Sequence, residues 1–432
     1  MRQIEQQHYD VIVIGGGQAG LAISYLLKQE KINHIVVERN QIANSWVHQR
    51  WDSFTLNTPN WMNLLPGMVL APNEDREAFK TNAQYIDTLV GYAKEHDLPV
   101  IEQCEVTAVH KGKDRYGVMV RYQETMKTLS ANQVVVASGQ MSDWKNPLFA
   151  YPIPSTITQI NAAEYKNPTQ VKGNVLIVGS GQSGVQLAEE LAKADYTGKG
   201  QLYLATSEVG RSPRRYRGKD MMEWLSLMGV MDMRMDELED ANISRQTQPQ
   251  VSGVGTYGHT VSLQSLHKMG VTPVGKLLTS TEKGFTFSDE VKQHIAFADQ
   301  GSETLKSKVD SFLKLTNQDD LFPQDEIDEA DCPDVNFSAA SSCTALSFSA
   351  IDTLIWAMGY QASFSYLHIP HVLNERGFPI HTNGVSPQPG LYYLGFPWLI
   401  KRKSGIIYGV AEDAQAIKEV LCHYRNRSVT TE

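Results

Sequence analysis

The sequence predicts an α/β fold with two Rossmann-like dinucleotide-binding domains, one of them inserted into the other. The stretch 11–27, VIVIGGGQAGLAISYLL, is typical of an apolar strand, a glycine-rich turn and a helix. The stretch 175–191, VLIVGSGQSGVQLAEEL, repeats this pattern in the same order. The chain has 432 residues, which is too long for one compact core and suits two or three domains. We therefore expect two dinucleotide sites in one chain.

The first glycine turn has the spacing GxGxxG, formed by Gly15, Gly17 and Gly20. The first glycine allows a sharp reversal, the second lets the backbone approach a pyrophosphate, and the third lets the helix pack on the strand. Free N–H groups at the helix start then face the diphosphate. The next strand ends at Glu38, whose carboxylate can accept hydrogen bonds from an adenosine ribose; the alternative is a structural βαβ unit with a chance acid. The expected contacts are Gly15, Gly17, Gln18, Ala19, Gly20, Glu38 and Arg39.

The second glycine turn is followed by the strand QLYLATS, which ends in Thr206 and Ser207 instead of an acid. The next residues, EVGRSPRRYRGKD, gather several arginines. Small hydroxyls and arginines in place of the acid are what a 2′-phosphate requires, so we assign NADPH to this turn and FAD to the first. The alternative is a solvated basic loop, which also contains Glu208. The expected NADPH contacts are Gly179, Gly181, Gln182, Ser183, Gly184, Thr206, Ser207, Arg211, Arg214 and Arg215.

The composition is that of a globular protein, with 41% hydrophobic and 20% charged residues. A net charge of -9 argues against nucleic acid or an anionic membrane as partner. No secretory h-region and no apolar run of about 18 residues is present, so we expect no signal peptide and no membrane span. The cysteines form no CxxC pair, which argues against a redox dithiol and a thiolate metal site. We expect a cytoplasmic protein without a metal, and a homodimer is possible.

The stretch KNPLFAYPIP (145–154) is typical of a crossover between domains because of its prolines. We expect a discontinuous FAD-binding domain comprising residues 1–150 and 326–432. The inserted NADPH-binding domain would comprise residues 155–325. The strand IDTLIWAMGY (351–360) is expected to return the chain to the FAD-binding domain.

These pieces resemble the flavin-containing monooxygenase-like flavoproteins, a group that includes the plant YUCCA-type enzymes. The resemblance covers nearly the whole chain and rests on GGGQAG, GSGQSG, VVVASG, WAMGY and the segment NSWVHQRWDSFTLNTPNWMNLLPG (44–67). Bacterial members with a similar RWDSF…TPNW stretch look closest. The resemblance implies a three-layer ββα FAD domain carrying an inserted NADPH domain.

The resemblance also implies roles for single residues. Asn57 matches an asparagine that faces the flavin and helps to hold a peroxyflavin, although asparagine also often caps a turn before proline. Arg50 would hold an anionic group of cofactor or substrate, or lie at the surface. The aromatic residues of the segment either shield the flavin or fill the core. The further cofactor contacts expected from the matching motifs are Trp46, Trp51, Gly139, Gly359, Ser404 and Gly405.

One motif departs from the family pattern. The fingerprint FxGxxxHxxxY/W is matched by STITQINAAEY (155–165), in which only Tyr165 survives. The leading interpretation is an NADPH-dependent FAD monooxygenase that passes one oxygen from a C4a-(hydro)peroxyflavin to a small organic substrate. The alternative is an NADPH oxidase or flavin-linked reductase without oxygen transfer. A flavin-binding redox sensor is a third interpretation. The second dinucleotide motif argues against it, because a sensor needs no dedicated source of hydride.

Overall fold

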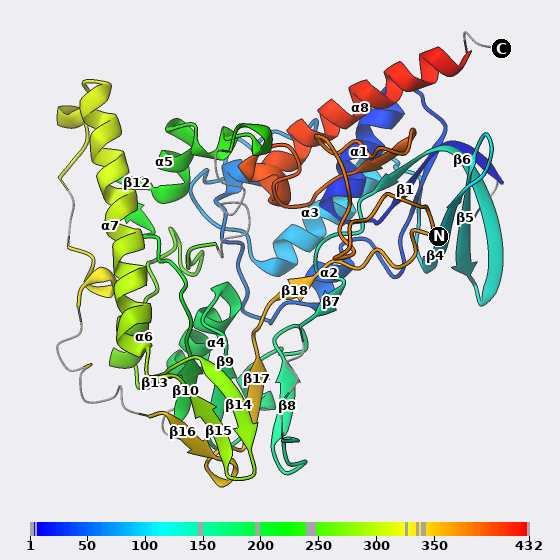
Figure 1. Cartoon of the computed structure of the whole chain (residues 1–432). Helices are drawn as coiled ribbons and strands as arrows, with labels where there is room; N and C mark the ends of the chain where they lie inside the picture. The colour runs from blue at the N-terminus through cyan, green and yellow to red at the C-terminus, as the bar shows by residue number, and fades with distance from the viewer. Residues whose placement is uncertain are drawn as a thin grey trace.

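The computed structural model contains two domains, each built around a parallel sheet (Figure 1). The chain leaves the first domain for the second and then returns, so the second domain is an insertion. The structure describes residues 4, 7–145, 149, 151–194, 199–238, 248–324, 327–333, 337 and 343–429.

The central sheet of the first domain is built around β1 (His8–Ile14). It pairs in parallel with β2 (His34–Val37) on one side and with β6 (Thr125–Val136) on the other. β3 (Val100–Ile101) extends the sheet beyond β2, and β19 (Leu391–Tyr393) extends it beyond β6. The second half of β1 (residues 11–14) and most of β2 (residues 35–37) are continuous apolar runs because layers cover both faces of the sheet.

Helices cover one face of this sheet and an antiparallel meander covers the other. The helical layer contains α1 (Gln18–Gln29), α3 (Asn82–Glu95) and α8 (Ile407–Val429). The meander joins β4 (Cys104–Lys111) and β5 (Tyr116–Tyr122) to the first half of β6. Alternate residues of β1 belong to the two apolar cores, as the two-residue period of a strand requires. The predicted three-layer ββα domain is therefore confirmed.

The second domain contains a five-stranded parallel sheet in the order β13-β10-β9-β17-β8. Its strands are β13 (Val271–Val274), β10 (Leu202–Ala205), β9 (Val175–Val178), β17 (Thr353–Trp356) and β8 (Thr158–Asn161). The strand β9, the second glycine turn and a helix repeat the order of the first domain. The predicted fold class, two Rossmann-like domains, is confirmed.

Layers cover both faces of the second sheet as well. α4 (Gln182–Lys193) and α6 (Leu263–Lys268) pack on one face. A small antiparallel sheet of β14 (Leu277–Thr281), β15 (Gly284–Phe287) and β16 (Ala345–Ser347) packs on the other. The inserted domain thus has the same three-layer plan as the first.

The expected return of the chain at residues 351–360 is wrong. β17 lies between β9 and β8 and pairs in parallel with both, so it is a central strand of the inserted domain. Its fully buried apolar sequence fits that position as well as it fits a strand of the first sheet. The chain crosses between the domains at β7 (Asp143–Trp144) and β18 (Tyr360–Gln361), which pair antiparallel. The insertion therefore extends through β17 rather than ending at residue 325.

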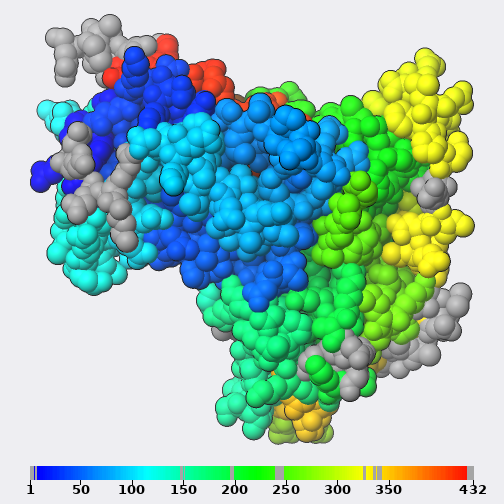
Figure 2. All heavy atoms as spheres, turned by 180° about the vertical axis from the view of Figure 1, so that it is seen from behind, coloured from blue at the N-terminus to red at the C-terminus, as the bar shows by residue number. Residues whose placement is uncertain are grey.

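A helical extension completes the inserted domain. β11 (Arg215–Tyr216) and β12 (Lys219–Asp220) form a short hairpin, followed by α5 (Met221–Leu227), which packs against α7 (Val291–Leu315). In Figure 2 the blue surface of the first domain meets the green surface of the inserted domain along a continuous border. None of the helices in the described part of the chain is both long and apolar enough to cross a membrane.

Candidate dinucleotide sites

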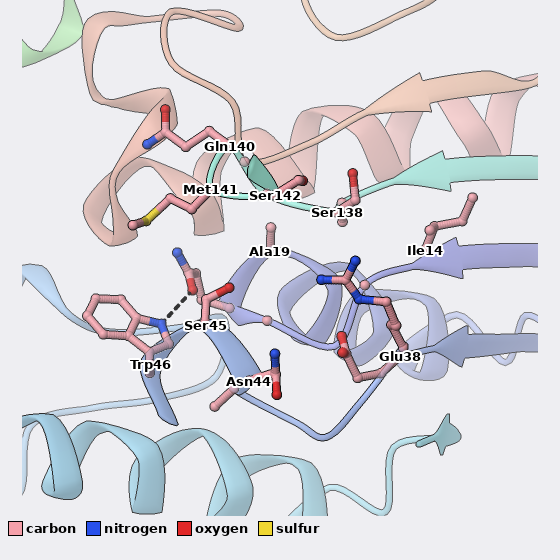
Figure 3. Close-up of a pocket in the computed structure, with 18 of the residues that line it drawn as sticks. Ile14, Ala19, Glu38, Asn44, Ser45, Trp46, Ser138, Gln140, Met141 and Ser142 are labelled. Carbon is pink, nitrogen blue, oxygen red and sulfur yellow. Dashed lines mark hydrogen bonds between the residues drawn. The ribbon is translucent and has the colours of Figure 1, made fainter. Parts of the chain in front are cut away.

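The first glycine turn opens into a cavity of about 610 Å³ (Figure 3). Gly15 has a φ of +111°, and a side chain there would clash with the carbonyl oxygen of Ala137. Gly17 differs, because a Cβ on it would meet no protein atom within 4 Å. The turn is therefore closed against its own domain and open toward the cavity, as a pyrophosphate requires. This space fits the diphosphate of FAD.

Glu38 lies at one end of this cavity. Its Oε2 accepts a hydrogen bond from the N–H of Gly16 at 2.7 Å and its Oε1 accepts one from Asn40 at 2.9 Å. Burial raises the pKa of the Glu38 carboxyl, and the two N–H donors oppose that shift. Each oxygen keeps a further lone pair, so the carboxylate can still accept from a ribose hydroxyl.

Most of the residues predicted for FAD line this cavity, but three do not. Gly20 packs α1 onto the turn, since a side chain there would clash with the carbonyl oxygen of Gly15. Trp51 is buried in the core, edge-on to Phe54. Ser404 is buried and accepts hydrogen bonds from the backbone N–H groups of residues 400 and 401, which shapes the turn before Gly405. The predicted residues that do line the cavity are Gly15, Gly17, Gln18, Ala19, Glu38, Arg39, Trp46, Arg50, Asn57, Gly139 and Gly405.

Asn57 lies where the two domains meet. Its side-chain Oδ1 accepts hydrogen bonds from Nε2 of Gln186 at 2.9 Å and from the N–H of Gly253 at 3.3 Å. Its carbonyl oxygen accepts from Nη1 of Arg214 at 2.9 Å. All three donors belong to the inserted domain, so the alternative of a local turn cap is wrong. The amide NH₂ has no hydrogen-bond partner within the described ranges, so it is available to donate to a ligand in the cavity.

Arg214 holds this junction together from a buried position. Its Nε donates to Oδ2 of Asp220 at 2.8 Å, and both side chains are almost completely buried. The guanidinium also lies over the ring of Phe79 at 4.4 Å from the centroid. Burial lowers the pKa of the Arg214 guanidinium and raises the pKa of the Asp220 carboxyl, which shows how strongly each charge depends on its partner.

The second glycine turn opens into a cavity of about 510 Å³. Gly179 has a φ of +110°, and a Cβ on it would lie 2.5 Å from the carbonyl oxygen of Ala357. A Cβ on Gly181 would meet no protein atom within 4 Å. The same division of roles as in the first turn makes this cavity fit a second diphosphate. The predicted residues that line it are Gly179, Gly181, Gln182, Ser183, Thr206, Ser207 and Gly359. Gly184 instead packs α4 onto the turn.

The expectation that three arginines hold the 2′-phosphate is wrong, because none of them lines this cavity. Arg211 is buried and paired with Asp299 at 2.7 Å and with Asp331. Arg214 is paired with Asp220, as described above. Arg215 is paired with Glu77 of the first domain at 2.8 Å. Arg211 and Arg214 are thus neutralised inside the protein, whereas Arg215 forms a partly exposed ion pair.

Two lysines line the second cavity, Lys145 at the crossover and Lys276 in the turn between β13 and β14. Thr206 is turned inward, since its hydroxyl donates to the carbonyl oxygen of Val274 at 2.8 Å and contacts His294. Ser207 and Lys276 both line this cavity and can offer a hydroxyl and a cation to a phosphate. A single lysine in a turn gives no sequence signal, so Lys276 was not predicted. Other lining residues that were missed are Cys104, Thr107, Lys145, Tyr360, Tyr366 and Ile407.

A family model described as pyridine nucleotide-disulphide oxidoreductase matches residues 12–322, which is more than half of the chain. The chain belongs to the pyridine nucleotide-disulphide oxidoreductase family. It is therefore a flavin-dependent oxidoreductase, and its cofactors are FAD and NADPH. All four cysteines of this family member are free.

Relatives of this pyridine nucleotide-disulphide oxidoreductase include an uncharacterized oxidoreductase, CzcO-like, of Geobacillus kaustophilus. It is 30% identical over 97% of this chain and 100% of its own length. A probable indole-3-pyruvate monooxygenase, YUCCA7 of Arabidopsis thaliana, is 27% identical over 50% of this chain and 52% of its own length. A solved flavin-containing monooxygenase from Stenotrophomonas maltophilia superposes with a TM-score of 0.62 at 18% identity, covering 97% of this chain and 99% of that one. The structural likeness shows the fold.

Proposed function

We propose that the protein is an NADPH-dependent FAD monooxygenase that transfers one oxygen atom from O₂ to a small organic substrate. FAD occupies the first cavity and NADPH the second. When bound, FAD supplies the chemistry, because it accepts hydride from NADPH and activates oxygen. The chain's own residues bind and orient the two cofactors and exclude water between them. We also propose a cytoplasmic location, because free cysteines suit a reducing compartment; a homodimer stays a prediction.

The amide of Asn57 carries this proposal. It lines the first cavity, its oxygen is occupied by donors of the inserted domain, and its NH₂ group faces no competing acceptor among the described residues. A neutral amide can donate to an oxygen atom that gains negative charge without releasing a proton to it. An enzyme that only passed electrons onward would gain nothing from a donor held so firmly at this place.

Replacing Asn57 with alanine should leave FAD bound, and NADPH should reduce the flavin at a near-native rate. The variant should, however, release H₂O₂ sooner than wild type. The loss of one donor from an enclosed site costs about 2.7–4 kcal/mol where it stabilises negative charge on oxygen. The expected result is faster NADPH consumption without substrate, with matching release of H₂O₂, measured by absorbance and a peroxidase assay.

The matched control is Asn60→Ala, which removes a buried amide of the same segment that donates to the carbonyl oxygen of Asp75 at 2.9 Å. This variant should lose stability without a change in peroxide release per NADPH. Equal peroxide release by wild type and Asn57→Ala would contradict the role given to Asn57.

We infer that Lys276 sets the preference for NADPH over NADH, since it is an exposed cation of the second cavity and follows β13, the strand paired with the one that leads to Ser207. Removing a charge-assisted contact to a phosphate costs about 1.5–3 kcal/mol, or roughly tenfold or more in affinity. Lys276→Ala should therefore raise the KM for NADPH about tenfold and leave that for NADH unchanged in steady-state assays. Arg215→Ala is the control and should change neither value, whereas a loss of NADPH preference in Arg215→Ala alone would return the role to the arginine cluster.

A reductase or oxidase is the second candidate, favoured by Asn161. This residue stands where the monooxygenase fingerprint has histidine, and it lines the second cavity. Its Oδ1 accepts a hydrogen bond from the N–H of Ala163 at 2.9 Å, so its side chain is folded onto its own turn. An enzyme of this kind would release all of its reducing equivalents to oxygen or to another acceptor.

A further inference from the structure

Arg50 is a cation of the first cavity whose contacts leave most of its donors unused. Its Nη1 donates to the carbonyl oxygen of Gln49 at 2.8 Å, and its Nη2 donates to the sulfur of Met141 at 3.3 Å. Sulfur is a weak acceptor, and a guanidinium offers five N–H donors. The guanidinium also lies over the rings of Trp46 and Phe54, at 4.9 Å and 5.2 Å from their centroids.

The charge of Arg50 has no carboxylate partner within the described part of the chain. Arg211, Arg214 and Arg215 each form an ion pair with at least one carboxylate. Burial lowers the pKa of the Arg50 guanidinium, and Tyr360 partly opposes this shift. A charge removed from water is stabilised by an opposite charge, so the pocket around Arg50 is suited to an anion brought by a ligand.

Arg50 lies at the end of the first cavity that is remote from Glu38. Figure 3 shows Trp46 and Met141, both of which Arg50 contacts, on the opposite side of the cavity from Glu38. Tyr360, which interacts electrostatically with Arg50, lines the second cavity. Met141, which Arg50 contacts, lies just before β7, and β7 pairs with β18, where Tyr360 lines the second cavity. Arg50 therefore lies on the side of the first cavity that is near the second.

The diphosphates of both cofactors already have sites of their own. Each glycine turn, at Gly17 and at Gly181, presents open space at the start of a helix. Arg50 belongs to neither turn. The anion that it is suited to bind is therefore not the diphosphate of either cofactor.

We propose that Arg50 binds the carboxylate of the organic substrate, so that the enzyme acts on small carboxylic acids. This inference rests on the proposed function, because it assumes that the enzyme acts on an organic substrate. The guanidinium presents a planar pair of donors that matches a carboxylate, and the rings of Trp46 and Phe54 hold its plane in position.

The test is equilibrium binding to the oxidised, FAD-loaded protein, followed by the change in visible flavin absorbance. The probes are benzoate, its uncharged isostere benzamide, and NADP⁺. Wild type should bind benzoate at least about tenfold more tightly than benzamide, and Arg50→Met should lose this difference while keeping its affinity for NADP⁺. Arg50→Lys should keep part of the preference, since the charge remains but the paired donors are lost. Lys276→Ala is the matched control and should show the reverse, with weakened NADP⁺ and unchanged benzoate.

Three results would overturn the proposal. The first is retention of the native preference for benzoate by Arg50→Met. Loss of NADP⁺ affinity in Arg50→Met would assign the guanidinium to a coenzyme phosphate. Absence of charge-dependent binding by wild type to benzoate, phenylacetate and hexanoate alike would also overturn it. Because no oxygen is consumed, these results are independent of whether the enzyme transfers oxygen.

Discussion

Replacing Gly17 with valine should abolish FAD binding and leave the polypeptide folded. A Cβ at this position meets no protein atom within 4 Å, so we expect valine to leave the first domain intact. It would instead fill the space through which the backbone approaches the pyrophosphate. The purified variant should be colourless, with the thermal unfolding temperature of apoprotein prepared from wild type. The measurements are flavin absorbance per protein and a melting curve of both apoproteins.

Two further glycine variants control this result. Gly181→Val should keep FAD and lose NADPH binding, because its side chain would enter the second cavity only. Gly15→Ala should lower stability as well as FAD content, because its φ of +111° and the carbonyl oxygen of Ala137 leave no room for a side chain. Full FAD occupancy in Gly17→Val would contradict the assignment of the first turn.

Replacing Arg214 with methionine should destabilise the protein by about 3–5 kcal/mol, because the change leaves Asp220 buried without its partner. The variant also loses the donor to the carbonyl oxygen of Asn57. Denaturant unfolding at neutral pH measures the effect, and the double variant Arg214→Met with Asp220→Asn should recover part of it. Arg215→Met is the control, since its pair with Glu77 is about one-third exposed and is worth about 0–1 kcal/mol. A loss below about 1 kcal/mol in Arg214→Met would mean that the buried pair does not hold the junction.

The sequence was sufficient for the parts of the structure that depend on local pattern. Both glycine turns have the predicted geometry, with a positive φ at Gly15 and Gly179 and open space beside Gly17 and Gly181. Asn57 was found through its motif, and the structure places it in the first cavity. Its fixed orientation was beyond prediction, because its partners Gln186 and Gly253 come from a domain far along the chain.

The errors have the same physical origin. Arg211 looked free for a phosphate because its carboxylates, Asp299 and Asp331, are remote in sequence. The strand β17 was assigned to the wrong sheet because a fully buried parallel strand has the same apolar sequence in either sheet. Lys276 was missed because nothing in the sequence of its turn indicates which cavity it will border.

Oxygen transfer coupled to NADPH oxidation is measured by comparing the amount of NADPH consumed with the amount of H₂O₂ formed. The purified FAD-loaded protein is supplied with NADPH in ¹⁸O₂ and with a panel of small organic acids, amines and thioethers. We expect that at least one compound lowers the H₂O₂ formed per NADPH consumed and gains a single ¹⁸O atom. Peroxide equal to the NADPH consumed with every compound, or NADPH consumption that proceeds unchanged without oxygen, would contradict it.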